Sequence, residues 1–295
     1  MRKSFEEKLL KMFAKTKENL RTIKTAGKLG WAMESNWTDP LLFAIYSIVR
    51  PIASSLILVV MYYVITRGKT GLDLFAYMYV GNAFFMYVIN VLFGISWVIH
   101  EDRDHYQMIR YIYISPIRMY YYLFGRGIAK MVLTTVAVII TMAFGMLVLK
   151  IPVNLLAVDY PLLLFSVAAG IFIIACLGIL LAGVSMVTAH HSYALTEGMA
   201  GLFYLACGAI YPIDILPIWL QYLSKALPLT YWLELVRRSV LGKSLSPTLS
   251  GYSNFQLILI MAATTLVLAL FSHWVYRSIE YIARKHGKID QLTNY

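Results

Sequence analysis

The sequence of 295 residues has little charge, since Asp, Glu, Lys and Arg make up 14 % of it, against about 25 % in soluble domains. Hydrophobic residues make up 60 %. So few charged side chains cannot cover this much apolar surface in water, which excludes a soluble enzyme. A disordered chain is excluded as well, because disorder requires low hydrophobicity. The composition predicts an integral membrane protein.

Cysteine is also scarce. The two cysteines, Cys176 and Cys207, lie in apolar runs, where a thiol behaves as a small hydrophobe, so no disulfide framework is predicted. His100 and His105 are five residues apart, which places their rings about 140° apart around a helix and argues against a shared metal. Neither Gly-Lys-Thr nor Gly-Lys-Ser has the earlier glycine that a phosphate-binding loop requires. The sequence therefore predicts no catalytic residue, metal or cofactor in this chain.

Six apolar stretches are present that we expect to cross a hydrocarbon core of about 30 Å. Eighteen Lys and Arg lie in the segments on one side of these stretches and seven on the other, so both termini are predicted to be cytoplasmic. The net charge of +11 fits this topology and contact with anionic lipids better than nucleic-acid binding. The stretches are approximately Ile45–Ile65, Leu72–Ile99, Tyr120–Leu149, Pro161–Val187, Gly198–Ile215 and Phe255–Tyr276.

Residues 1–40 have apolar side chains at three- and four-residue steps with lysines between them. This pattern predicts a cytoplasmic amphipathic arm on the inner leaflet, with a solvated basic tail as the alternative. Gly27, Gly30, Trp31 and Trp37 predict a break and an interfacial elbow before Asp39-Pro40. Residues 41–277 then form the six-span domain, and residues 278–295 form a cytoplasmic tail.

The segment 213–241 is too apolar for a solvated loop and too rich in proline for a single crossing. We expect short re-entrant helices before the last span, because irregular backbone at membrane depth must pack against protein or face water. An amphipathic helix outside the membrane is the alternative. Glu234 and Arg238 can pair at i and i+4. The residues assigned to this re-entrant segment are Pro217, Pro228, Glu234, Arg237 and Arg238.

The charged hairpin that begins at Glu101 joins two long predicted helices on the cytoplasmic side. Its mixed charges indicate a short helix that projects from the bilayer and docks to a soluble partner, with a solvated turn as the alternative. Ionisable residues are nearly missing from the span centres, which argues against a carrier driven by protons or sodium.

Two stretches carry a family resemblance; they read HEDRDHYQMIRYIYISPIRMYYYLFGRGIAK and GAIYPIDILPIWLQYLSKALPLTYWLELVRRSVLG. Both are similar to type 2 ATP-binding-cassette (ABC) export permeases. The resemblance implies an all-α, six-span subunit in a prokaryotic plasma membrane, paired with a second permease subunit as a homodimer. It also implies a cytoplasmic ABC ATPase partner that holds the ATP and magnesium.

The resemblance further implies a coupling helix at about 101–109 and a substrate path along the first, second and fifth spans. The coupling residues would be Glu101, Asp102, Arg103, Asp104, His105, Tyr106 and Met108. The path residues would be Tyr62, Phe84, Tyr87, Asn90, Phe203 and Tyr204.

The predicted function is a non-catalytic permease subunit of an ATP-driven exporter. It would move an amphiphilic substrate, such as a drug, lipid, glycolipid or polysaccharide, out of the cytoplasm or inner leaflet. A membrane-embedded lipid-modifying enzyme is an alternative, for which Glu101, Asp102, Asp104 and His105 are the candidate groups. An ion-coupled secondary transporter and a non-transporting scaffold are further alternatives.

Overall fold

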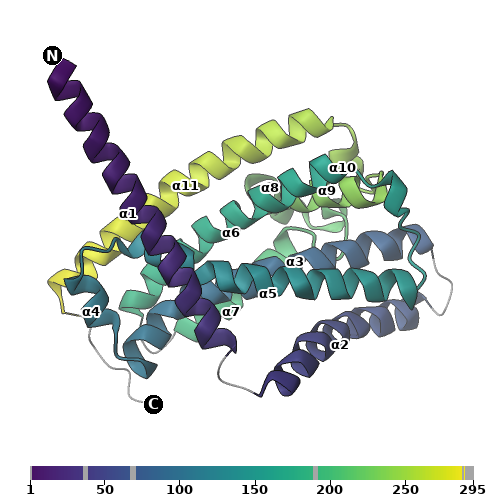
Figure 1. Cartoon of the computed structure of the whole chain (residues 1–295). Coiled ribbons are helices and arrows are strands. Elements are labelled where there is room, and N and C mark those ends of the chain that lie inside the picture. Colours follow the sequence, from purple (N-terminus) through teal and green to yellow (C-terminus); the bar gives the residue numbers. More distant parts are fainter. Residues whose placement is uncertain (1, 36–38, 67–70, 189–191, 288, 290–295) are drawn as a thin grey trace.

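The computed structural model describes residues 2–35, 39–66, 71–188, 192–287 and 289, and within these ranges the chain is helical without β-strands (Figure 1). Five helices are long and apolar enough to cross a membrane. The other helical elements are shorter, except for the N-terminal helix α1. The five are α2 (Pro40–Thr66), α3 (Leu72–His100), α5 (Met119–Leu147), α6 (Tyr160–Val187) and α11 (Asn254–Lys285).

The remaining elements lie before, between or beside these five. They are α1 (Arg2–Ser35), the π-helix η1 (Glu101–His105), α4 (Ile109–Ile114), the 3₁₀-helices η2 (Leu155–Ala157) and η3 (Ile213–Ile215), α7 (Ser192–Ala206), α8 (Ile218–Ala226), α9 (Pro228–Leu241) and α10 (Pro247–Ser250). Helices α3, α6 and α11 run toward the end of the bundle where α4 lies, and α5 runs the opposite way (Figure 1). We call these ends the α4 end and the α10 end.

Helix α3 is the centre of the bundle and packs against both α5 and α6. In an apolar segment of 18 residues within α3, 67 % of the residues are buried. The buried share of the corresponding segment is 22 % in α2 and 17 % in α11. Small residues allow the close packing: a β-carbon on Gly127 or Gly178 would lie 2.7–2.8 Å from atoms of Ile95. The outer helices α2 and α11 leave wide apolar faces for lipid or for partner protein.

Local signals in the sequence account for several helix ends. The Asp159 side chain accepts a hydrogen bond from the Leu162 amide at 3.1 Å and begins α6. Ser253 and Gln256 form a capping box at the start of α11. Gly242, at φ 69°, ends α9 in the left-handed conformation that glycine adopts without strain.

The sequence predicts six spans, whereas the described residues contain five helices that are long and apolar enough to cross a membrane. The difference is the predicted span Gly198–Ile215, where α7 has only 15 residues, or about 22 Å, and ends at Ala206. The chain then turns at Gly208, which has a φ of 65°. A stretch of apolar residues gives the length of a span only when one helix contains all of them.

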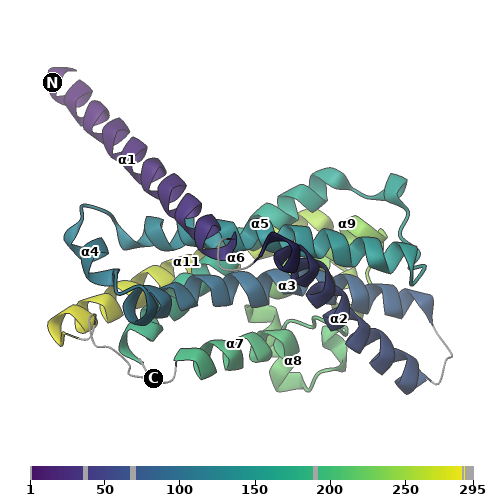
Figure 2. The same cartoon turned by 60° about the horizontal axis from the view of Figure 1, so that its bottom comes forward.

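Helix α1 continues through Gly27 and Gly30 to Ser35, so the expected break at these glycines is wrong. Both glycines instead allow α1 to approach α5 closely, because a β-carbon on Gly30 would lie 3.1 Å from the Arg126 carbonyl oxygen. The N-terminal half of α1 extends away from the bundle (Figure 2). Trp37, the other residue of the expected elbow, lies outside the described residues.

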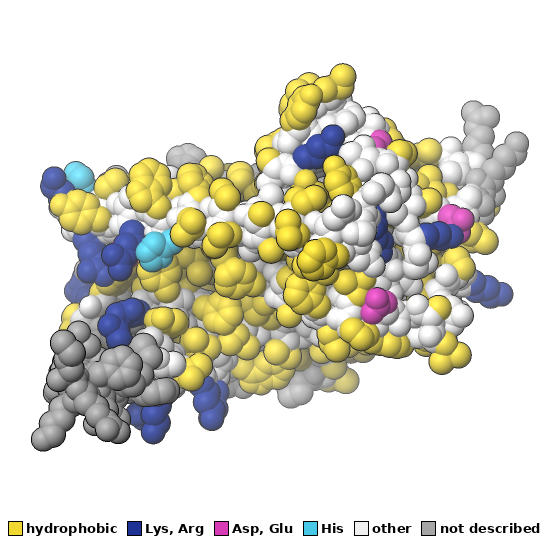
Figure 3. Space-filling view, turned by 90° about the horizontal axis from the view of Figure 1, so that it is seen from above, with side chains coloured by type: hydrophobic (Ala, Val, Ile, Leu, Met, Phe, Trp, Pro, Cys, Tyr) yellow, Lys and Arg dark blue, Asp and Glu magenta, His cyan; other side chains and the backbone are white. Residues whose placement is uncertain are grey.

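Hydrophobic side chains cover the middle of the face in Figure 3, and Lys and Arg gather toward the α4 end. An apolar band with charges at its ends is the surface that a bilayer requires.

Candidate functional site

The segment Glu101–His105 extends α3 by one π-helical turn and buries two of its charged side chains within the protein. Asp102 is fully buried and Arg103 is 2 % exposed. These two charges are therefore not presented at the surface of the single chain, and the coupling role stays a prediction. A π-helical turn of this kind is rare and occurs frequently at functional sites.

The carboxylates of Glu101 and Asp102 in this turn are paired with α5. Arg126 Nη2 lies 2.6 Å from a carboxylate oxygen of Glu101 and 3.8 Å from one of Asp102. The Tyr122 hydroxyl donates a hydrogen bond to Asp102 at 2.7 Å. We call Glu101, Asp102, Tyr122 and Arg126 the α4-end cluster.

Helix α1 joins the same region. Glu34 forms an ion pair with Lys130 of α5, and Arg126 contacts the sulfur of Met33. A β-carbon on Gly125 would lie 2.6 Å from the Ile23 carbonyl oxygen, so glycine is required for this approach of α1 and α5. The α4-end cluster thus connects the N-terminal helix, the end of α3 and the start of α5.

Helix α4 supplies the exposed surface at this end of the molecule. Ile109 and Ile112 are buried against the bundle, whereas Tyr111 and Ile114 are 71 % and 77 % exposed. Ile117, just after the helix, is also exposed. Exposed apolar side chains grouped beside a charged end of a membrane protein indicate a contact with another protein or with the membrane. We call Tyr111, Ile114 and Ile117 the α4 surface.

The predicted coupling residues are therefore divided by the structure. His105 and Tyr106 are exposed, Met108 is half-buried, and a carboxylate oxygen of Asp104 lies 3.2 Å from His100 Nδ1. Tyr111 and Ile114 lie beyond the predicted limit of the coupling helix. The signal that could have found them is the apolar run IRYIYI between the charged turn and the Ser-Pro pair.

A cavity of about 710 Å³ lies between α2, α3 and α5, with Glu34 of α1 and Glu197 of α7 also in its lining. Its lining combines Phe43, Trp97 and other apolar side chains with charged groups such as Arg50. This combination suits a ligand that has both apolar and polar parts. Of the six predicted path residues, Asn90 lines this cavity.

The other five path residues pack against protein. Tyr87 donates a hydrogen bond to Thr135 at 2.8 Å, and Tyr204 donates one to Asn82 at 2.9 Å. Tyr62, Phe84 and Phe203 are buried. Each of these side chains thus has a structural contact within the single chain.

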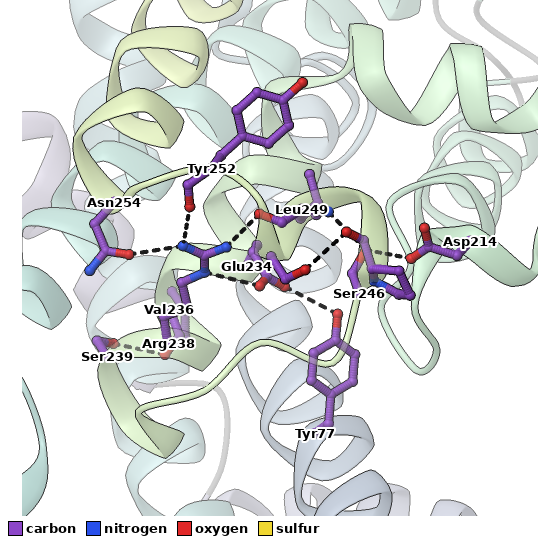
Figure 4. A network of polar contacts seen from close by, with 12 residues as sticks. Tyr77, Asp214, Glu234, Val236, Arg238, Ser239, Ser246, Leu249, Tyr252 and Asn254 are labelled. Carbon is purple, nitrogen blue, oxygen red and sulfur yellow. Dashed lines mark hydrogen bonds and ion pairs between the residues drawn. The ribbon is translucent and has the colours of Figure 1, made fainter.

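At the α10 end, the predicted re-entrant segment forms α8 and α9, begun by Pro217 and Pro228 (Figure 4 shows its polar contacts). Arg237 is buried, donates hydrogen bonds to the Gly208 and Ala209 carbonyls at 2.7 and 2.6 Å, and lies 3.9 Å from the centre of the Tyr77 ring. It thereby supplies hydrogen bonds to carbonyl groups of the turn that follows α7.

Glu234 is the buried anion of this network. It accepts hydrogen bonds from the Tyr77 hydroxyl at 3.2 Å and from Arg238 at 3.1 Å (Figure 4). The i, i+4 pair that the sequence predicts is therefore present. Arg238 also donates to the Leu249 and Tyr252 carbonyls at 2.6 and 2.7 Å. We call Tyr77, Glu234, Arg237 and Arg238 the α10-end cluster.

Sequence reasoning missed Asp214, which ties η3 to the start of α10. Its carboxylate accepts hydrogen bonds from the Ser246 hydroxyl and from the Thr248 amide, the latter at 3.0 Å (Figure 4). Burial raises the pKa of Asp214, but these hydrogen bonds together outweigh it and hold the pKa below its usual value. The partners are more than 30 residues apart in sequence, so no local pattern indicates the contact.

The architecture defines a multi-pass helical membrane protein. The sequence model of the ABC-2 type transporter family matches residues 29–241, which is more than half of the chain, and the chain belongs to this family. Members of the family are typically non-catalytic membrane subunits that work with ATPase partners. A comparison with curated proteins gives no match.

Proposed function

We propose that this chain is the permease subunit of an ATP-driven exporter, and that a cytoplasmic ATPase subunit binds the α4 surface. The observation that carries the proposal is the position of this surface: exposed apolar residues on α4 directly follow a buried charged turn that connects α1, α3 and α5. A force on α4 would therefore reach the most buried helix of the bundle. ATP and magnesium would be held by the partner.

We further propose six crossings, with both termini on the α4 side. Helix α6 ends at the α4 end and α11 begins at the α10 end (Figure 1). The chain between them must pass from one end to the other, so α7 and the turn at Gly208 together would make the crossing that the 15 residues of α7 do not complete alone. Helices α8 and α9 would then be re-entrant.

The mechanism follows from two packings of the same helices. Closure of two ATPase subunits in a dimer would press the paired α4 surfaces together and shift α3 against α5, which couples nucleotide state to access from each side. The cavity of about 710 Å³ supports an amphiphilic cargo, because apolar and charged groups share its lining. Export from the cytoplasm or inner leaflet is part of this proposal.

The test is purification of the whole chain from its native membrane, with mass spectrometry of the proteins that accompany it. We expect an ABC ATPase subunit with the unmodified chain and its loss, by about tenfold or more, with Ile114→Asp. The matched control is Leu156→Asp, because Leu156 is an apolar residue that is 96 % exposed outside the α4 surface. Equal recovery of the ATPase with both variants would overturn the assignment of the docking surface, and ATP hydrolysis by the isolated chain would overturn the division of labour.

A further inference from the structure

A second cavity, of about 590 Å³, lies between α4, the start of α5 and the last turns of α11. It shares no lining residue with the larger cavity. Ile117 of the α4 surface also lies in its lining. The charged groups of the cavity, however, indicate a ligand chemistry that neither the transport path nor an apolar docking surface explains.

The lining of this cavity is strongly basic. It contains Arg118, Arg277 and Arg284 together with one carboxylate, Glu280. Glu280 is paired with Arg284 at 2.7 Å, and Arg284 also lies 5.0 Å from the centre of the Tyr113 ring. No ion pair joins Arg118 or Arg277 to a carboxylate of the described residues, so an excess of two positive charges faces the cavity.

The level of the cavity relative to the membrane follows from the length of α11. Its 32 residues extend for about 48 Å, which is longer than a hydrocarbon core of about 30 Å. The last turns, which line the cavity, therefore lie at the level of the lipid headgroups. Trp274 and Tyr281 are each about two thirds exposed in these turns, as expected for an aromatic belt at the membrane surface.

We propose that this cavity binds the phosphate group of an anionic membrane lipid, with Arg118 and Arg277 as the phosphate-binding residues. Arg donates several hydrogen bonds to a phosphate in a fixed geometry, and basic pockets between helices at a charged membrane surface bind such headgroups. A lipid held between Arg118 at the start of α5 and Arg277 of α11 would join the α4–α5 turn to the last helix. The proposal does not depend on the cargo or on the ATPase partner.

The first experiment is a titration of the purified, delipidated chain with phosphatidylglycerol, monitored by native mass spectrometry. Phosphatidylcholine with the same acyl chains tests whether the negative charge is required, and millimolar inorganic phosphate tests whether a free anion suffices. We expect phosphatidylglycerol to bind more tightly than phosphatidylcholine, and R118Q/R277Q to lose most of this preference. The loss expected is about 25-fold, or fivefold for each cation.

The matched control is K150Q/K225Q, which removes two exposed positive charges outside the cavity. Retention of the preference in this control, with its loss in R118Q/R277Q, supports the site. An equal loss in both variants would show general charge attraction and overturn the proposal. Displacement of the lipid by inorganic phosphate alone would also overturn it, in favour of a soluble anion.

A second measurement covers the case in which R118Q/R277Q folds poorly. Tyr281 is exposed and lines the cavity, so the photoreactive residue p-benzoylphenylalanine in its place should crosslink to phosphatidylglycerol in vesicles. Crosslinking to a protein subunit in native membranes, without any lipid adduct, would contradict the proposal.

Discussion

Two groups of buried charges lie at opposite ends of α3, and they differ in how completely their polar atoms are paired. In the α10-end cluster, Glu234, Arg237 and Arg238 all have partners among the described residues. In the α4-end cluster and its neighbour Arg103, three buried atoms lack a hydrogen bond to the described residues. They are Asp102 Oδ1, Arg103 Nη1 and Arg126 Nε.

The difference has a physical consequence for each end. A fully paired buried network is rigid, because any shift breaks several hydrogen bonds in a region of low dielectric constant. An incompletely paired network breaks fewer hydrogen bonds when it rearranges, since some of its buried polar atoms already lack a partner. The α10-end cluster therefore fixes the fold, and the α4-end cluster is suited to a change of packing beside the proposed ATPase contact.

The largest effect should come from Arg237→Met. This change removes the donor to the Gly208 and Ala209 carbonyls and leaves them unpaired in a buried place. We expect the free energy of unfolding to fall by about 3–5 kcal/mol, as for loss of one member of a buried charged network. The measurement is the midpoint of thermal unfolding in detergent. Lys225→Met, at an exposed cation, is the control, and equal midpoints for the two variants would refute a structural role for Arg237.

A smaller loss of stability is expected for Arg126→Met in the α4-end cluster. The change removes the 2.6 Å contact with Glu101 and the contact of α5 with Met33. We expect the free energy of unfolding to fall by about 1–3 kcal/mol. It should also weaken the packing of α1 against α5. We therefore expect trypsin to cleave within α1 faster in this variant than in the unmodified chain. If Arg126→Met destabilises the chain as much as Arg237→Met, the proposed difference between the two clusters is wrong.

The smallest effect concerns pH and Asp214. Because the folded pKa of Asp214 is lowered, its hydrogen bonds contribute stability above the unfolded pKa of about 4, and this stability is lost as the pH falls through the folded value. The unfolding midpoints of the unmodified chain and Asp214→Asn should thus converge between pH 7 and pH 3. A constant separation of the two midpoints over this range would contradict the lowered pKa.

Much of the fold was predictable from local sequence. The apolar stretches located all five long helices, and the pairing of Glu234 with Arg238 followed from their spacing. The predictions failed where distant segments decide the outcome. Gly30 permits a contact with α5 instead of a break, because α5 supplies the surface against which α1 packs.

The candidate site was predictable in its location but not in its exposed residues. The charged turn after α3 was identified from its charged residues in the sequence. Asp102 is nevertheless buried, because Tyr122 and Arg126 of the neighbouring helix α5 supply its partners. The exposed residues Tyr111 and Ile114 carry apolar side chains that sequence reasoning assigns to the interior.

The sequence by itself determined the membrane class, the long apolar helices, their caps and the family resemblance, because each depends on residues that are neighbours along the chain. The tertiary structure alone decided which charges are buried, which face of α4 is exposed and where α7 ends. Burial and pairing depend on side chains contributed by other helices, and no local pattern contains that information.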